Sequence, residues 1–187
     1  MSRFSILPIL RGHWRGLTND LSDGTTIPDW PVRIALGSVS GVVLVCSYVL
    51  GWQIASPTAT LSAMALLSAG LLGVFTQLSS LRIRLTDRPD EAWLDVERDG
   101  IDEAVAHVLL AFLLCISSGA LLVAGMNLVA WYRPGTPELD RWWSGPVLAI
   151  GAYILMTFLI LVPKLYSAYT EMNSVRNELN GFHRTKR

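Results

Sequence analysis

The residues best suited to chemistry lie in an acidic stretch before the third apolar segment. Asp99, Glu103 and His107 are spaced four apart, so on an α-helix they share one face. Carboxylate oxygens and an imidazole nitrogen are ligands for divalent metals. Three such residues without a fourth ligand, close to several arginines, are more typical of a solvated helix face, and the sequence predicts neither a metal nor a cofactor. His107 by itself is either a pH-sensitive group near the membrane edge or an interfacial histidine without a role.

The sequence lacks the motifs of common enzymes. It contains no Gly-rich phosphate loop, no nucleophile elbow, no His-Glu-x-x-His and no paired carboxylates within an apolar segment. Fifteen basic and fifteen acidic side chains cancel, which gives nucleic-acid binding no overall electrostatic support. Cys46 and Cys115 both lie in apolar runs and are expected to act as small hydrophobic residues. We therefore expect a non-enzymatic protein with no catalytic residues and no nucleic-acid partner.

The composition indicates an integral membrane protein. Of the 187 residues, 51% are hydrophobic and 16% are charged, and the mean hydropathy is +0.41. Four apolar segments, at about 34–52, 59–80, 108–130 and 146–165, have the length of about 20 residues that an α-helix needs to cross a bilayer. They are continuous and do not alternate in polarity, which predicts helices and not barrel strands. The expected fold class is an all-α integral membrane protein.

The distribution of Lys and Arg predicts the orientation of these spans. Thirteen of the fifteen lie before the first span, between the second and third, or after the fourth, and only Arg133 and Arg141 lie elsewhere. Because cytoplasmic connections retain basic residues, we expect both termini and the helical loop 81–107 in the cytoplasm, and the protein in the inner (plasma) membrane. Six aromatic residues mark the opposite interface: Tyr48, Trp52, Trp131, Tyr132, Trp142 and Trp143.

Residues 4–21 have the pattern of an amphipathic helix. Five apolar residues fall on one stripe: Leu7, Leu10, Trp14, Leu17 and Leu21. Arg11 and Arg15 lie off this stripe, and a basic helix of this kind either lies in the membrane interface or packs on the ends of the spans. His13 is expected on the surface, and residues 22–31 are expected to form a turn-rich connector.

Two further patterns predict helices that continue beyond the bilayer. Leu78, Leu81 and Leu85 extend the second span, and Pro89 suits the first turn of another helix. After the fourth span, four residues share a helical face and are candidates for partner binding: Leu165, Tyr169, Met172 and Leu179. The sequence thus predicts an antiparallel four-helix transmembrane bundle at 32–166, with cytoplasmic helical parts at 1–31, 81–107 and 167–187.

Small residues recur four apart within the spans and predict close helix packing, either inside the chain or between the subunits of a homo-oligomer. They are Gly37, Gly41, Ala65, Ala69, Gly73, Ala120 and Ala124. Polar residues in the spans either line a polar path or bond to a helix backbone, and the second is favoured because no charge marks an ion route. They are Ser38, Ser40, Ser47, Ser62, Ser68, Thr76, Gln77, Ser117, Ser118 and Asn127.

Several short motifs are similar to those of a known group of proteins. Gly12-His13-Trp14-Arg15-Gly16-Leu17, Pro28-Asp29-Trp30, and Phe75-Thr76-Gln77-Leu78-Ser79-Ser80-Leu81, followed by an acidic helix and Ala106-His107, resemble small, uncharacterised bacterial membrane proteins with four spans. Proteins of this build also resemble membrane components of bacterial anti-phage systems, which implies no site residues. We predict a membrane-anchored sensor, effector or scaffold that engages a cytoplasmic protein. The alternative is an oligomeric channel, pore-forming or transport subunit.

Overall fold

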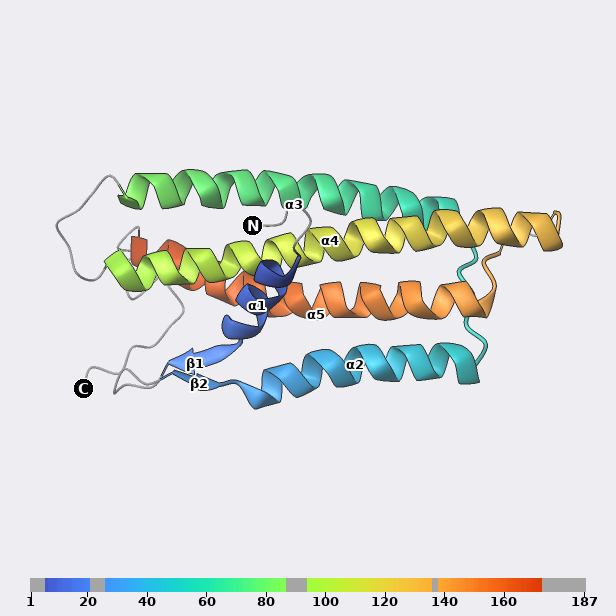
Figure 1. Ribbon diagram of the computed structural model, residues 1–187, viewed down its shortest axis with the longest axis horizontal. Coiled ribbons are helices and arrows are strands. Elements are labelled where there is room, and N and C mark those ends of the chain that lie inside the picture. Colours follow the sequence, from blue (N-terminus) through green and yellow to red (C-terminus); the bar gives the residue numbers. More distant parts are fainter. Residues whose placement is uncertain (1–5, 21–25, 87–93, 136–137, 173–187) are drawn as a thin grey trace.

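The computed structural model describes residues 6–20, 26–86, 94–135 and 138–172, which form five helices and one small hairpin (Figure 1). The elements are α1 (Leu7–Arg15), β1 (Thr18–Asp20), β2 (Thr26–Pro28), α2 (Trp30–Val49), α3 (Pro57–Thr86), α4 (Leu94–Tyr132) and α5 (Arg141–Met172). Each of the four long helices is long and apolar enough to cross a membrane. The predicted set of four apolar helices is confirmed, and it is compatible with a multi-pass membrane protein.

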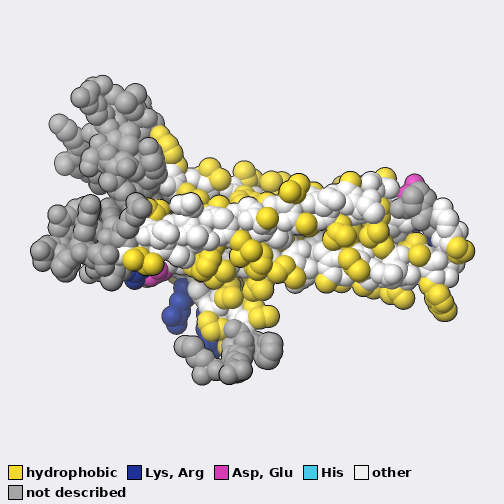
Figure 2. Space-filling model, turned by 90° about the horizontal axis from the view of Figure 1, so that it is seen from above, with side chains coloured by type: hydrophobic (Ala, Val, Ile, Leu, Met, Phe, Trp, Pro, Cys, Tyr) yellow, Lys and Arg dark blue, Asp and Glu magenta, His cyan; other side chains and the backbone are white. Residues whose placement is uncertain are grey.

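The apolar parts of these helices overlap the predicted spans, and their ends differ from the predicted ones by two to eight residues. They cover Trp30–Val49, Pro57–Ile83, Gly100–Tyr132 and Arg141–Pro163. The first begins at Trp30, earlier than expected, because the Asp29 side chain caps the helix by accepting a hydrogen bond from the Val32 amide at 3.3 Å. On the face seen in Figure 2, the charged side chains lie towards the two ends and on a projecting segment, while hydrophobic side chains occupy the middle.

The four long helices lie side by side in the order α3, α4, α5, α2 (Figure 1). Neighbouring helices in this order pack together: α3 with α4, α4 with α5, and α5 with α2. In each pair the two helices run in opposite directions (Figure 1). Apolar side chains from α3, α4 and α5 form the main core, which includes Leu71, Val108 and Ile154. Gly145 of α5 allows α2 to pack closely, since a Cβ built there would lie 3.2 Å from the ring of Tyr48 on α2. The helices therefore form a row with α3 and α2 at its edges.

Specific polar contacts fasten the two ends of the row. At the end near the hairpin, Arg82 of α3 donates two hydrogen bonds to the Asp102 carboxylate of α4, at 2.9 and 3.2 Å. At the other end, the Leu139 amide bonds to the Ile54 carbonyl at 3.0 Å. The Ser144 hydroxyl donates to the Leu139 carbonyl at 2.8 Å and accepts from the Ile54 amide at 3.0 Å. This end is thus held by buried backbone bonds between segments distant in sequence.

The N-terminal segment differs from the single helix predicted over residues 4–21. The helix α1 ends at Arg15, and Gly16 follows it as the C-cap. Beyond it, residues 18–20 pair with 26–28 in an antiparallel ladder, and the Asp29 amide bonds to the Leu17 carbonyl at 2.9 Å. The prediction of a longer helix is wrong because this backbone satisfies its hydrogen bonds by pairing across the connector. Leu21 and the predicted helix start at Pro89 lie outside the described residues.

Candidate functional site

The helix α1 lies across α4, near the level at which α2 begins (Figure 1). Two glycines allow this close approach. A Cβ built on Gly12 would lie 3.0 Å from the Cβ of Ala106, and one built on Gly16 would overlap the side chain of Glu103. The backbone of α1 therefore sits directly on α4, at a distance that larger side chains would prevent.

The face of α1 that docks is not the predicted apolar stripe. Leu7, Leu10 and Trp14 of that stripe are 53%, 38% and 48% exposed, whereas Leu17, which follows α1, is buried. His13 is only 1% exposed, so the prediction that it lies on the surface is wrong. The reason is steric. Gly12 and Gly16 allow α1 to approach α4 closely, and His13, which lies between them in the sequence, is therefore buried against the bundle.

Burial of His13 creates a polar cluster at the junction of three helices. Its Nε2 shares a hydrogen bond of 2.8 Å with the hydroxyl of Tyr153 on α5. Its ring meets the ring of His107 on α4 edge-to-face, with 4.5 Å between centroids. His107 is fully buried, and its Nε2 lies 3.8 Å from Oε1 of Glu103. Two buried imidazoles, a phenol and a carboxylate therefore meet where α1, α4 and α5 come together.

The sequence pointed to Glu103 and His107 but not to their partner. The side chain of Asp99, the third member of the predicted helix face, lies outside the described side chains, and the described residues contain no group of three His, Cys, Asp or Glu that could hold a metal ion. His13 and His107 lie in helices that are far apart in the chain, so no local spacing joins them. The available signal is the pattern Gly12-His13-x-x-Gly16, in which two glycines four apart share a helix face and a polar residue lies beside that face.

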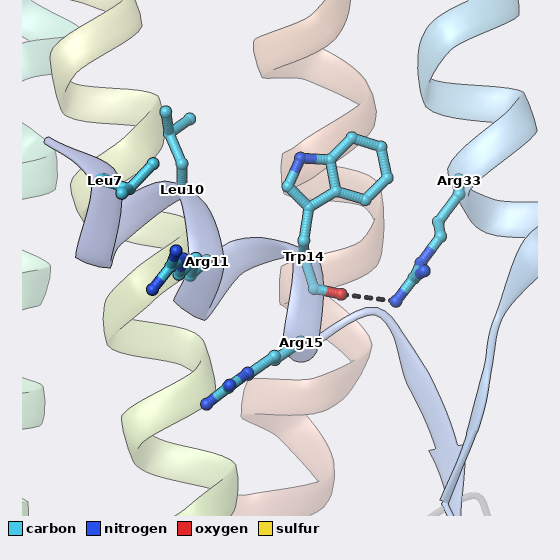
Figure 3. Close-up of a pocket in the computed structure, with 6 residues that line it drawn as sticks. All are labelled: Leu7, Leu10, Arg11, Trp14, Arg15 and Arg33. Carbon is cyan, nitrogen blue, oxygen red and sulfur yellow. Dashed lines mark hydrogen bonds between the residues drawn. The ribbon is translucent and has the colours of Figure 1, made fainter.

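The outer side of α1 forms a shallow groove of about 480 Å³, lined by Leu7, Leu10, Arg11, Trp14, Arg15 and Arg33 (Figure 3). Arg33, from the first turns of α2, donates a hydrogen bond to the Trp14 carbonyl at 2.6 Å. Its guanidinium lies 5.4 Å from the ring centroid of Trp14 and 5.9 Å from that of Trp30. Arg33 therefore ties α1 to α2 at the outer surface.

The predicted helix-packing residues lie elsewhere and face outwards. All seven, namely Gly37, Gly41, Ala65, Ala69, Gly73, Ala120 and Ala124, are exposed. No side chain or other helix lies within 4 Å of a Cβ built on Gly37, Gly41 or Gly73. Gly37, Gly41 and Gly73 therefore meet no neighbouring helix in the described part of the chain, because α2 and α3 occupy the edges of the row. Packing of these residues against a second copy stays a prediction.

Most polar residues of the spans bond to their own helix. Eight hydroxyl or amide groups donate to a carbonyl three or four residues earlier, at 2.7 to 3.3 Å: those of Ser38, Ser40, Ser47, Ser62, Ser68, Thr76, Ser117 and Asn127. Such bonds satisfy the polar group inside an apolar surface. This geometry agrees with the backbone-bonding interpretation and leaves the polar path without a supporting contact in the described spans.

The candidate partner-binding residues are described only in part. Leu165 is half-buried and packs against the main core. Tyr169 and Met172 belong to α5, which continues to Met172, but their side chains are outside the described set, as is the whole of Leu179. A role in partner binding stays a prediction for all four.

Known proteins provide no relative for comparison with this site. No family model matches the chain, and no curated protein or solved structure matches it either. The resemblance to small bacterial proteins with four spans therefore stays an expectation.

Proposed function

We propose that this chain is a non-enzymatic sensor or scaffold of the bacterial inner membrane, with an antiparallel four-helix bundle and both termini in the cytoplasm. It engages a cytoplasmic protein partner through the helical parts on the α1 side. The observation that carries the proposal is the docking of α1 on α4 through His13 and His107, both of which are buried. A short element held by titratable groups is suited to respond to a signal.

The length of α1 supports this proposal. A helix of nine residues is marginal in water and owes its stability to the surface on which it packs. Its contacts with the bundle rest on Gly12, Gly16 and the histidine cluster, so a small change at these contacts shifts the balance between docked and released α1. The same side of the molecule carries the ends of α3 and α5 and the start of α4 (Figure 1).

Partner binding is tested at the end of α5. A photo-reactive residue at Tyr169 is expected to form one discrete intermolecular adduct in native membranes, because the sequence pattern predicts an apolar helical face at Tyr169 and Met172 that a partner would cover. Met172→Asp should lower the adduct yield about tenfold by placing a charge in that contact, and Met172→Leu should preserve it. Cross-links within the chain alone, or equal yields from the Asp and Leu variants, would contradict a partner at this face.

Orientation is tested by cysteine labelling from outside intact cells, in a background lacking Cys46 and Cys115. Glu138→Cys lies in the exposed segment between α4 and α5 and should react with a membrane-impermeant maleimide. Asp95→Cys, near the start of α4, should react only after the cells are opened. Labelling at residue 95 in sealed cells would overturn the placement of both termini in the cytoplasm.

The channel alternative is tested by conductance. Purified chain in planar bilayers is expected to give no reproducible current, since most of the polar side chains described in the spans bond to their own helices. Reproducible currents that change on replacing Ser68 or Thr76 would favour the channel over the sensor.

A further inference from the structure

We propose that the groove outside α1 binds the phosphate of an anionic phospholipid. The groove lies between α1 and the start of α2 and is lined by the six residues shown in Figure 3. The inference concerns a lipid and does not depend on the proposed sensor or its protein partner.

The groove lies at headgroup depth if α2 spans the bilayer. The 20 residues of α2 extend about 30 Å, which is the thickness of the hydrocarbon core. Its two ends must therefore lie at the two interfaces, and Arg33 lies three residues from the first of them. Trp30 and Trp14 beside it are 62% and 48% exposed, as expected for aromatic residues at a membrane surface.

The groove has an excess of positive charge. Three of its six lining residues are Arg11, Arg15 and Arg33, and the other three are apolar. The carboxylates that the structure describes nearby are engaged elsewhere. Asp29 caps α2 through the Val32 amide, and Glu103 lies beneath α1 against His107. The field in the groove therefore favours an anion.

Arg33 is held in place with donors to spare. One of its terminal nitrogens donates to the Trp14 carbonyl, and the two indole rings support the guanidinium plane. Its Nε is buried and has no hydrogen-bond partner in the described part of the chain. A guanidinium carries five N–H donors in a planar fork that matches phosphate oxygens, and because Nε is buried, a ligand in the groove would meet the terminal N–H groups that do not bond to Trp14.

The apolar lining distinguishes a phospholipid from free phosphate. Figure 3 shows Leu10 and the Trp14 ring pointing in the direction in which α2 runs into its span, whereas the Arg15 side chain points away from that direction, on the side of α1 opposite to Arg33. Leu7, Leu10 and Trp14 are all exposed. This polarity matches an amphiphile whose phosphate meets the arginines and whose acyl chain covers the leucines.

The test uses the full chain purified in a neutral detergent and titrated with phosphatidylglycerol or with phosphatidylcholine of the same acyl chains, with bound lipid counted by native mass spectrometry. We expect phosphatidylglycerol to bind at least about tenfold more tightly. The double variant Arg11→Gln with Arg15→Gln should lose roughly 10- to 30-fold in this affinity. Arg141→Gln is the matched control, because Arg141 lies 5.6 Å over the Trp142 ring at the other end of the molecule, and it should change nothing.

Three results would overturn the proposal: equal affinity for the two lipids, an unchanged affinity in the double variant, or the same loss in Arg141→Gln. Displacement of the lipid by millimolar inorganic phosphate would identify a free-phosphate site instead. If the double variant does not fold, Leu10→Gln keeps all three arginines and should still weaken phosphatidylglycerol several-fold. If Leu10→Gln binds phosphatidylglycerol as tightly as the parent chain, the acyl chain does not contact the leucines of the groove.

Discussion

Replacing Gly12 with Leu is expected to release α1 from α4. A Cβ at this position would already lie 3.0 Å from the Ala106 Cβ, which is fixed to the backbone of α4 and cannot move aside. Overpacking of this kind costs about 1–3 kcal/mol, which corresponds to roughly 5- to 150-fold faster exchange of the α1 amides. Leucine is a better helix former than glycine, so the loss would come from docking and not from the helix itself. Amide exchange of residues 9–16 in nanodiscs measures the effect.

Gly41→Leu is the matched control for this change. Gly41 also lies in a helix, but a Cβ built there meets no other group within 4 Å. The α1 amides of this variant should exchange as in the parent chain. Equal exchange in the Gly12→Leu variant and the parent would show that α1 does not rest on α4. A fall in oligomer mass specific to Gly41→Leu would place the small-residue face in a contact between copies.

Acidification is expected to release α1 as well. His13 is faced by Tyr153 from α5 and by His107 from α4, and Glu103 lies 3.8 Å from His107, while Arg33 of α2 donates to the neighbouring Trp14 carbonyl. Glu103 can balance one positive charge, whereas two imidazolium rings with centroids 4.5 Å apart would repel each other without water between them. Released α1 carries His13 into water, where its protonation meets no such opposition. The released state therefore binds more protons, and docking is expected to weaken as the pH falls.

The size of this effect follows from proton linkage. Each pH unit favours the released state by up to tenfold for one extra proton bound on release, so the released fraction should rise on the order of tenfold between pH 7 and pH 5. Spin labels at Leu7→Cys and Glu138→Cys, in a background lacking Cys46 and Cys115, report the position of α1 as a distance distribution. The distribution should be narrow at pH 8 and broad at pH 5.

Two variants separate the histidine pair from other causes of acid sensitivity. His107→Gln leaves one histidine and should abolish the step between pH 8 and pH 5. Tyr153→Phe removes the 2.8 Å bond to His13 but keeps both imidazoles, so docking should weaken at every pH while the step remains. Identical distributions across the pH range in the parent chain, or an undiminished step in His107→Gln, would be inconsistent with the pair acting as the switch.

The sequence predicted the long helices well because their signal is contained within each segment. A continuous apolar run near 108–130, for example, has one stable conformation in lipid, which is a helix with every backbone bond made internally. The ends of the helices were predicted less well, because each end depends on the capping contacts of one or two residues. Asp29 moved the start of α2 to Trp30 by capping it, although it reads in the sequence as part of a turn.

The docking face of α1 could not be predicted because the usual rule fails in lipid. In water, the leucine stripe of α1 would be the face to bury, but beside a membrane it can remain outside at little cost while glycines provide the contact with the protein. The same ambiguity affected Gly37 and Gly41, which are small but face outwards. The contact of His13 with His107 arises from the order of whole helices, which no local pattern encodes.

The order of helices in the row also constrains how the protein is made. Of the four long helices, α2 is synthesised first, yet it packs on α5, which is synthesised after the other three. Until synthesis of α5 is complete, α2 must persist alone in the bilayer, and its outward valines Val42, Val45 and Val49 provide a surface that lipid solvates without a protein neighbour. The hairpin and α1 precede α2 and wait with it, because α4 and α5, which supply the partners of His13, emerge later. Docking of α1 is thus a late event in assembly, because it requires that α5 has already been synthesised.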